Sequence, residues 1–198
     1  TLNRFADLCE RRGQDEPAAG YRQRASDLAQ AIEHSAWDGA WYLRAFYDDG
    51  SPLGSSEDQE CQIDSIAQSW GVLSGGGDLP RLTQAMQSVS EHLVRRSQRL
   101  VLLFTPPFDK TLRDPGYIKG YPPGVRENGG QYTHAALWSA WAFLGLGRIE
   151  EGFELFQLLN PILHADTSEK SVHYRVEPYV VAADVYGAPP FTGQGGWT

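Results

Sequence analysis

The sequence predicts an all-α chain that forms part of an α/α toroid, a ring of helical hairpins around a common axis. Three observations support this prediction. Apolar residues recur at helical spacing in several segments of about 10 to 18 residues. The loops that join these segments are alternately short and elaborate, as in an array of helical hairpins. The sequence contains no clean internal repeat of the ankyrin or tetratricopeptide type, so a toroid is favoured over a repeat protein.

Composition places the chain among ordered globular proteins. Of its 198 residues, 41% are hydrophobic and 12% aromatic, which is enough for a buried core and excludes intrinsic disorder. The net charge is −8, and because nucleic-acid binding needs a basic face, we expect no nucleic-acid partner. No run of about 18 apolar residues occurs, so we expect no membrane insertion. The two cysteines have neither metal-ligand nor disulfide spacing, so we expect no metal site and a cytoplasmic location.

The first elements expected are a helical hairpin and a short β element. The first helix should end near residue 12, where two arginines precede Gly13. A second helix is predicted over 17–33, because Pro17 suits a first helical turn and the apolar residues share one stripe. Alternating side chains over 41–47, followed by an Asp-Asp-Gly turn, predict a short strand or hairpin.

Two helices and a long loop should follow. The apolar spacing predicts a helix over 63–73 that is ended by three consecutive glycines, and another helix over 79–96. The apolar stretch 100–104 is closed by two prolines, and a loop rich in Gly, Pro and aromatic residues extends from there to Gly130. Because loops of this length in compact domains are functional or disordered, its aromatic content favours an ordered active-site or binding loop.

The last third of the chain should contain helices over 133–146, 149–159 and 178–186, with an extended segment over 172–176. The apolar periodicity is already under way at the first residue, and the last residues carry no terminal signal. We therefore expect residues 1–198 to be a single fragment of one domain, cut at both ends.

The densest group of polar side chains lies where the long loop meets the helix over 133–146. Carboxylates and amides hydrogen-bond sugar hydroxyls, aromatic rings suit pyranose faces, and a helix N-terminus favours an anion such as phosphate. The alternative is that the acidic and amide residues cap the helix and that the histidine belongs to the core. The candidates are Glu127, Asn128, Gln131, Tyr132 and His134.

Other polar groups have structural alternatives as well. Glu177 is either a pocket residue or the cap of the helix expected after it. The aromatic stretch 37–42, with Arg44, offers a sugar-binding surface or part of the core. Glu60, Gln62 and Asp64 are most simply first-turn residues of a helix, and the histidines at 164 and 173 lack the spacing of a zinc site.

Four stretches of the sequence resemble glycoside hydrolase family 94, the family of cellobiose- and chitobiose-phosphorylase-like enzymes. They cover residues 37–46, 63–70, 124–135 and 176–186, so that the resemblance extends over nearly the whole chain. A Glu-Asn pair followed by His at the seventh position after Glu, together with a Glu-Pro-Tyr-Val segment, carries most of the specificity. Within the family, the chain looks most like the C-terminal phosphorylase-like region of bacterial cyclic β-1,2-glucan synthases.

This resemblance implies the later half of an (α/α)6 barrel and inverting phosphorolysis of a β-glucosidic bond. Inorganic phosphate would be the co-substrate, and no further cofactor is expected. Glu127 matches the family's sugar-binding glutamate, and His134 matches its phosphate-contacting histidine. Further sugar contacts are expected from Asn128, Gln131, Tyr132 and Glu177. The family's general acid lies upstream of Thr1, so we expect no catalytic residue in this chain and no turnover by the chain alone.

A second function class stays open beside the enzyme. Because the visible sequence contains no assignable general acid, the chain is alternatively a noncatalytic helical module that binds glucan or scaffolds a larger protein. In either case the expected partners are a β-glucan and the rest of the same polypeptide. If the chain belongs to an enzyme, phosphate is a further expected partner. The expected cytoplasmic location includes the cytoplasmic domain of an inner-membrane protein.

Overall fold

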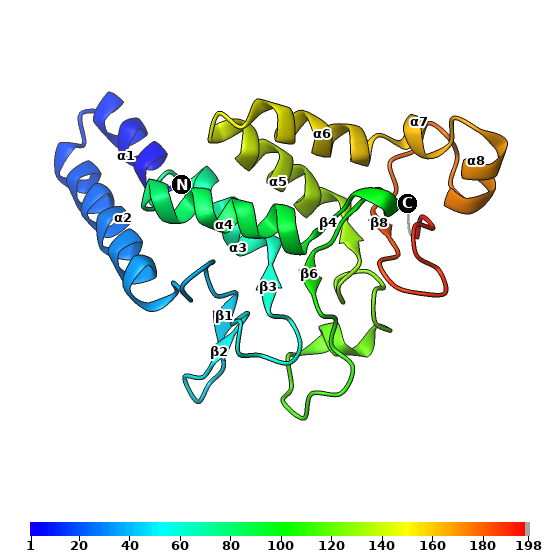
Figure 1. The fold of residues 1–198 in the computed structure, drawn as a ribbon. Coiled ribbons are helices and arrows are strands. Elements are labelled where there is room, and N and C mark those ends of the chain that lie inside the picture. The colour runs from blue at the N-terminus through cyan, green and yellow to red at the C-terminus, as the bar shows by residue number, and fades with distance from the viewer. Residues whose placement is uncertain (197–198) are drawn as a thin grey trace.

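The computed structural model describes residues 1–196, which form helices connected by loops that carry short strands (Figure 1). The helices are α1 (Leu2–Arg11), α2 (Asp15–Ser35), α3 (Ser65–Ser74), α4 (Leu79–His92), α5 (Thr133–Gly145), α6 (Ile149–Leu159), α7 (Pro161–His164) and α8 (Ser168–Tyr174), with 3-10 turns η1 (Arg96–Gln98) and η2 (Tyr117–Gly120). The strands are β1 (Ala45–Phe46), β2 (Pro52–Leu53), β3 (Ile63–Asp64), β4 (Val94–Arg95), β5 (Leu100–Val101), β6 (Phe104–Thr105), β7 (Gln131–Tyr132) and β8 (Asp184–Val185).

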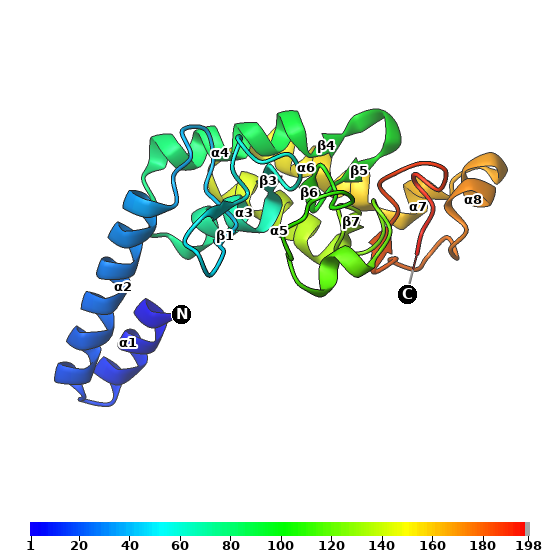
Figure 2. The same ribbon diagram turned by 90° about the horizontal axis from the view of Figure 1, so that it is seen from below.

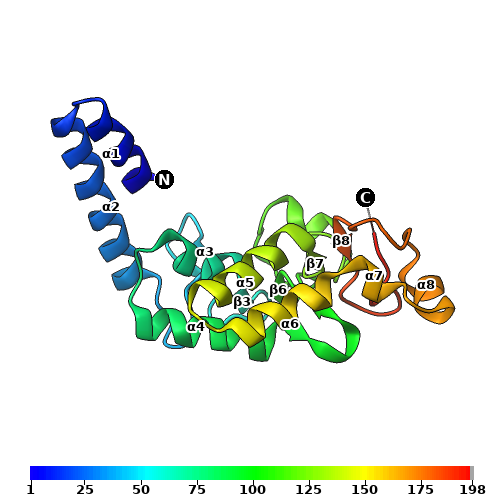
Figure 3. The same ribbon diagram turned by 90° about the horizontal axis from the view of Figure 1, so that it is seen from above.

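Four helices, α3 to α6, form the body of the molecule. Helix α3 packs against both α4 and α5, and α5 packs against α6, so the body consists of two adjacent helical hairpins (Figure 3). The hydroxyl groups of Ser69 and Ser139 join α3 to α5 at 2.9 Å. Gly152 favours close packing of α5 and α6, because a Cβ there would lie 2.6 Å from the Cδ2 of Leu144 and 3.1 Å from the carbonyl oxygen of Ala140.

The hairpin of α1 and α2 projects away from this body (Figure 2). Its two helices are joined by a small cluster of Ala6, Cys9 and Ala18. At the inner end of α2, Glu33 accepts hydrogen bonds from the hydroxyl of Tyr42 at 2.6 Å and from the Nη1 of Arg81 at 2.8 Å. These two bonds connect the projecting hairpin to the body.

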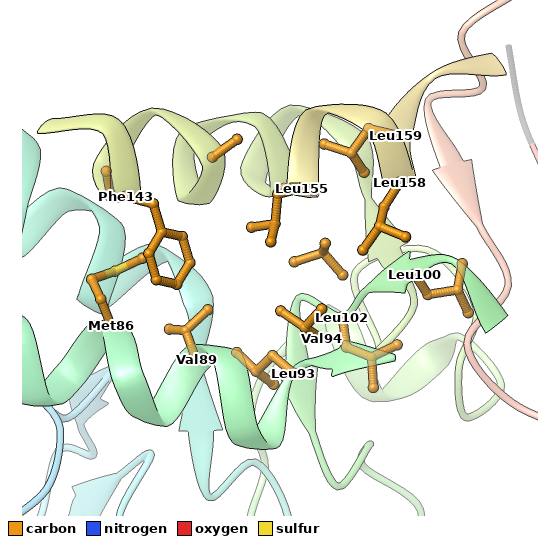
Figure 4. Packing of buried hydrophobic residues seen from close by; sticks show 14 of the residues in the cluster. Met86, Val89, Leu93, Val94, Leu100, Leu102, Phe143, Leu155, Leu158 and Leu159 are labelled. Atoms are coloured by element: carbon orange, nitrogen blue, oxygen red, sulfur yellow. The ribbon is translucent and has the colours of Figure 1, made fainter. Parts of the chain in front are cut away.

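The main core lies between α4, α5 and α6. Met86, Val89 and Leu93 recur along α4 at helical spacing and face Phe143 of α5 and Leu155 of α6 (Figure 4). All five side chains are fully buried. Because burial of one such side chain contributes about 1.5–3 kcal/mol, this layer is the main source of stability for the body.

Short antiparallel strands bring the beginnings of α3 and α5 to one end of the body. Strand β3, which leads into α3, pairs with β6, and β7, which leads into α5, pairs with β8. The backbone of Leu103 joins the two pairs, since its carbonyl oxygen accepts from the N–H of Ser65 and its own N–H donates to Gly130, both at 2.8 Å. The long loop and the polar residues near position 130 therefore lie at this end.

Most predicted elements are confirmed. The helices expected near residue 12, over 17–33, 63–73, 133–146 and 149–159 are present as α1, α2, α3, α5 and α6. The expected β element is the β1–β2 hairpin. The glycine stop is confirmed as well, because Gly75 ends α3 in the left-handed conformation with a φ of 73°.

Three predictions of secondary structure are wrong. The helix expected over 79–96 ends at His92, because β4 pairs with β5. The segment 172–176 is not extended; its first residues belong to α8, which begins after Thr167, whose side chain accepts from the N–H of Lys170. No helix forms over 178–186, because Asp184 and Val185 form β8 and pair with β7; Val185 is buried there, whereas Tyr179 and Val181 stay exposed.

Two faces of the body remain apolar and exposed. Leu137, Trp141 and Leu144 form a stripe along α5, and Ile149, Phe153 and Phe156 form another along α6, each at i, i+4 and i+7 spacing. The opposite faces of both helices are buried in the core. Helices that are apolar on more than one side are typical of the interior of a larger domain. None of the helices within residues 1–196 combines the length and the apolar character that a bilayer span requires.

His164 attaches the α7–α8 segment to the end of α6. Its buried ring stacks on Tyr174 with a centroid distance of 4.8 Å, and its Nε2 lies 2.7 Å from the carbonyl oxygen of Leu158. Burial lowers the pKa of His164; the Leu158 carbonyl opposes this shift, and the charges of Arg99 and Lys170 add to it. The folded chain therefore favours the neutral imidazole.

This preference predicts acid sensitivity of the folded state. The unfolded chain takes up a proton at His164 near pH 6.5 and the folded chain does so only at lower pH, so the unfolding free energy should fall as the pH drops below about 6.5. In His164→Gln, which keeps a donor for Leu158, this fall should be smaller. Thermal unfolding of the intact protein at about pH 7.5 and about pH 5.5 measures it, with the exposed His34→Gln as control. If the wild type and His164→Gln lost the same unfolding free energy between these two pH values, the acid sensitivity would not come from His164.

Candidate functional site

A tight turn over residues 125–128 carries the predicted site residue Glu127. The N–H of Asn128 donates to the carbonyl oxygen of Val125 at 3.0 Å, and Arg126 has a φ of 50°, in the left-handed region. Gly124 donates to the carbonyl oxygen of Asn128 at 2.8 Å and closes the turn. The turn is followed by β7 and then by α5, so Glu127 precedes the beginning of that helix.

The carboxylate of Glu127 is partly buried. Its Oε2 is enclosed and has no hydrogen-bond partner among the described residues. A buried acceptor without a donor costs about 1–3 kcal/mol. A ligand hydroxyl that donates to this oxygen would remove that cost, so Glu127 is suited to bind a sugar.

His134 is the second residue of α5 and is exposed to solvent. Its ring lies 4.3 Å from the ring of Trp138, which in turn contacts Trp70 at 5.2 Å. The N-cap position of α5 is Tyr132, which provides no side-chain cap. The structural alternatives for this cluster are therefore wrong, since His134 is not in the core and neither Glu127 nor Asn128 caps the helix.

Asn128 and Gln131 are buried, and both of their amide groups bond within the chain. The Oδ1 of Asn128 accepts from the N–H of Phe108 at 2.8 Å, while its Nδ2 donates to the carbonyl oxygens of Phe108 at 2.9 Å and Tyr121 at 2.8 Å. The Oε1 of Gln131 accepts from the N–H of Val101 at 3.0 Å. The predicted sugar contacts of these two residues are not favoured by this geometry, which gives both side chains the role of holding backbone segments.

Tyr132 and Glu177 differ in their surroundings. Tyr132 is half-buried and packs against the cluster that includes Leu103 and Phe104. Glu177 is exposed, and its backbone carbonyl accepts from the N–H of Val180 at 3.0 Å in a turn rather than at the start of a helix. Its alternative role as a helix cap is therefore wrong, and the roles of both residues in binding sugar stay predictions.

Two charged residues near the turn had not been singled out from the sequence. Arg126 lies over the ring of Tyr121 at 5.4 Å, and its pKa is raised, mainly by a hydrogen bond with Tyr121. Asp184 is buried, and a Cβ on Gly196 would lie 2.6 Å from its carboxylate oxygens. The signal for Asp184 was a single acid inside the apolar run 180–185, which marks a buried polar group.

The aromatic stretch 37–42 belongs to the core, so of its two predicted roles the structural one is confirmed. The indole N–H of Trp41 donates to the carbonyl oxygens of Gly54 at 3.0 Å and Gln62 at 2.9 Å. Asp38 accepts from the N–H of Ser56 at 2.7 Å. These side chains hold neighbouring loops, and the rings of Trp41 and Tyr42 are buried.

A buried ion pair lies at the beginning of α3. Asp64 caps this helix by accepting from the N–H of Ile66 at 2.7 Å, which confirms its predicted place at a helix start. Its other oxygen pairs with Arg44, whose guanidinium lies 5.3 Å from the centre of the Phe104 ring. Burial raises the pKa of Asp64, and Arg44 opposes this rise. Glu60 is different, since it binds the N–H groups of the long loop rather than those of α3.

Two cavities lie outside the turn. One of about 500 Å³ lies between α2 and α4 and is lined by Glu33 and Arg81 among others. The other, of about 330 Å³, lies between the β1–β2 hairpin and residues 108–113 of the long loop. Glu127 and His134 line neither of them. Within residues 1–196, no group of three or more His, Cys, Asp or Glu side chains is arranged to hold a metal ion.

Comparison with protein families identifies the fold to which these elements belong. The catalytic domain of the glycosyl hydrolase 94 superfamily matches residues 1–198. The chain belongs to this superfamily. It is 52% identical over 198 residues to the cyclic beta-(1,2)-glucan synthase NdvB of Rhizobium meliloti (strain 1021), covering 100% of this chain and 7% of that protein.

The family 94 chain is also similar to phosphorylases. It is 31% identical over 208 residues to N,N'-diacetylchitobiose phosphorylase of Vibrio proteolyticus and 32% identical over 195 residues to solabiose phosphorylase of Paenibacillus borealis. These alignments cover 99% and 98% of this chain, and 25% of each relative. The family 94 chain thus spans a quarter or less of the length of the relatives it matches.

Proposed function

We propose that this family 94 chain supplies the sugar and phosphate contacts of an inverting phosphorylase site that acts on a β-linked, most specifically β-1,2-linked, glucan. The observation that carries the proposal is the unpartnered buried oxygen of Glu127 before the beginning of α5, whose second residue is the exposed His134. The similarity to a cyclic beta-(1,2)-glucan synthase supports the choice of glucan, and the similarity to two phosphorylases supports the choice of reaction.

The chemistry assigns a separate task to each side chain. An acid protonates the glycosidic oxygen as its bond to the anomeric carbon breaks, while a phosphate oxygen forms a new bond to that carbon from the opposite face. The products are a shortened glucan and an α-glucose 1-phosphate. His134, in the first turn of α5, would donate to phosphate, because unpaired N–H groups and the helix dipole attract anions there. Glu127 would accept hydrogen bonds from sugar hydroxyls.

We further propose that the chain is one part of an (α/α)6 barrel and that the rest of the same polypeptide completes the site. The exposed apolar stripes of α5 and α6 support this proposal, since they are the kind of surface that neighbouring helices of a barrel cover. The general acid would come from that remaining part. A cytoplasmic location is proposed as well, supported by two buried cysteines that form no disulfide, Cys9 and Cys61.

The test of this function uses the intact protein that contains the chain. With β-1,2-glucooligosaccharides and inorganic phosphate, it should release glucose 1-phosphate. Glu127→Gln should raise the KM for sugar about tenfold, because a charge-assisted hydrogen bond becomes a neutral one, and should leave the KM for phosphate nearly unchanged. Glu150→Gln, on the exposed start of α6, is the control. Sugar binding without any phosphate-dependent product would instead favour the noncatalytic glucan-binding module.

A further inference from the structure

The long loop over residues 106–130 is ordered although most of it lacks regular structure. Apart from η2, its backbone groups cannot be satisfied by a helix or by an extended sheet. Side chains provide the partners instead. Asn128 and Glu60 bond to four backbone N–H and carbonyl groups at the start of the loop and to one near its middle.

Asn128 joins two distant points of the loop. It is fully buried, and its amide binds both backbone groups of Phe108 as well as the carbonyl oxygen of Tyr121. Since Asn128 directly follows Glu127 in the tight turn, the same side chain fixes the distance from the turn to both points. Tyr121 in turn contacts the ring of Tyr117 at 6.3 Å.

Glu60 holds the next part of the loop. Its Oε1 accepts from the N–H of Lys110 at 2.7 Å and its Oε2 accepts from the N–H of Thr111 at 3.0 Å. The following residue, Cys61, donates its N–H to the carbonyl oxygen of Pro106 at 2.7 Å. The start of the loop is thereby attached to the segment that leads into β3 and α3.

We infer that Asn128 and Glu60 are positioning residues that hold this loop as a preformed wall beside Glu127. The inference rests on the proposed function for its consequence, which is that the sugar meets a wall already in place. Ordering a free loop of this length on binding would weaken affinity, whereas a loop fixed in advance carries no such cost. The binding of phosphate is not expected to depend on this wall, because the proposed phosphate donor, His134, is held by α5.

Hydrogen exchange in the intact protein tests the clamp directly. Asn128→Ala should accelerate exchange of the Phe108 amide by at least about tenfold. Glu60→Gln should accelerate exchange at one of the two amides that Glu60 binds, Lys110 or Thr111, because Gln keeps only one acceptor oxygen. Asn160→Ala is the matched control, because it removes one helix-cap bond to Ile162 without contact to the loop. Unchanged exchange at all three loop amides would overturn the inference, whatever the enzyme does.

Steady-state kinetics test the consequence. Both variants should raise the KM for β-1,2-glucooligosaccharides by roughly 10- to 100-fold and leave the KM for phosphate within about twofold. If Asn128→Ala fails to fold, Asn128→Asp and Glu60→Gln provide the same readouts. An equal rise of both KM values, or faster exchange with unchanged sugar KM, would overturn the positioning role. A wild type without phosphorolysis would overturn the proposed function instead, while the exchange experiment still decides whether the clamp exists.

Discussion

Replacing His134 with alanine in the intact protein is expected to raise the KM for phosphate by about 10- to 100-fold. This is the change that corresponds to the loss of one hydrogen bond to a charged group. The side chain is exposed in the first turn of α5, and the N-cap residue of that helix, Tyr132, makes no side-chain cap hydrogen bond. Without the imidazole, only the helix dipole would attract phosphate, and this attraction stabilises bound phosphate less than a direct hydrogen-bond donor does. The KM for sugar should change by less than about threefold.

The measurement varies phosphate and sugar separately and follows the release of glucose 1-phosphate. His34→Ala is the matched control, because His34 is also exposed near the end of a helix but lies in α2. A phosphate KM that stays at the wild-type value would remove His134 from the phosphate site. A parallel rise of both KM values would indicate that the substitution disturbs α5 as a whole.

Replacing Arg44 with alanine should reduce the free energy of unfolding by about 3–5 kcal/mol, the usual cost of breaking a buried ion pair from one side. Asp64 is 1% exposed and would keep its charge without a partner, or would take up a proton. The substitution also removes the guanidinium that packs over Phe104. Because Asp64 caps α3, the damage would reach the helix whose Trp70 contacts Trp138, the ring that lies beside His134.

A double substitution separates charge from packing. Arg44→Met combined with Asp64→Asn keeps apolar volume and a capping oxygen but removes both charges, so it should recover most of the stability lost in Arg44→Ala. Denaturant unfolding of the intact protein gives the comparison. Arg22→Ala, which breaks exposed pairs with Asp7 and Glu10, should reduce the free energy of unfolding far less than Arg44→Ala does, because solvent screens exposed pairs. Similar losses in Arg22→Ala and Arg44→Ala would show that burial does not strengthen the Arg44 pair.

The longer helices of this fold could be predicted because their signals are local, whereas the short helices α7 and α8 were not predicted. Apolar spacing defines α2, α4 and α6, and Gly75 marks the end of α3 within one turn of the helix itself. The strands β3, β7 and β8 could not be predicted, because each has two residues and its partner lies far away in the sequence. Apolar residues over 178–186 satisfy a helical pattern equally well, and only the distant partner β7 selects the extended form.

The candidate site shows the same limit at the level of side chains. The sequence did not decide whether Glu127 and Asn128 cap α5 or whether His134 lies in the core, and only the structure excludes these alternatives. An amide side chain suits sugar hydroxyls and backbone peptide groups equally, so residue type could not reveal that Asn128 binds Phe108 and Tyr121. Asn128 is 20 residues from Phe108, and that separation places the contact beyond any local pattern.

The apolar stripes of α5 and α6 have a consequence for biosynthesis. The contacts of α3 with α4 and of α5 with α6 join neighbours in the sequence, so each of these two hairpins can form soon after it leaves the ribosome. The contacts of α3 with α5 join distant segments, so the four helices collapse into one intermediate only after the long loop and α5 have been synthesised. The collapsed intermediate would then present Trp141, Phe153 and Phe156 to water until further helices cover them. Such a surface is a binding site for chaperones and a starting point for aggregation, so the order in which helical hairpins are synthesised becomes part of what determines the yield of folded protein.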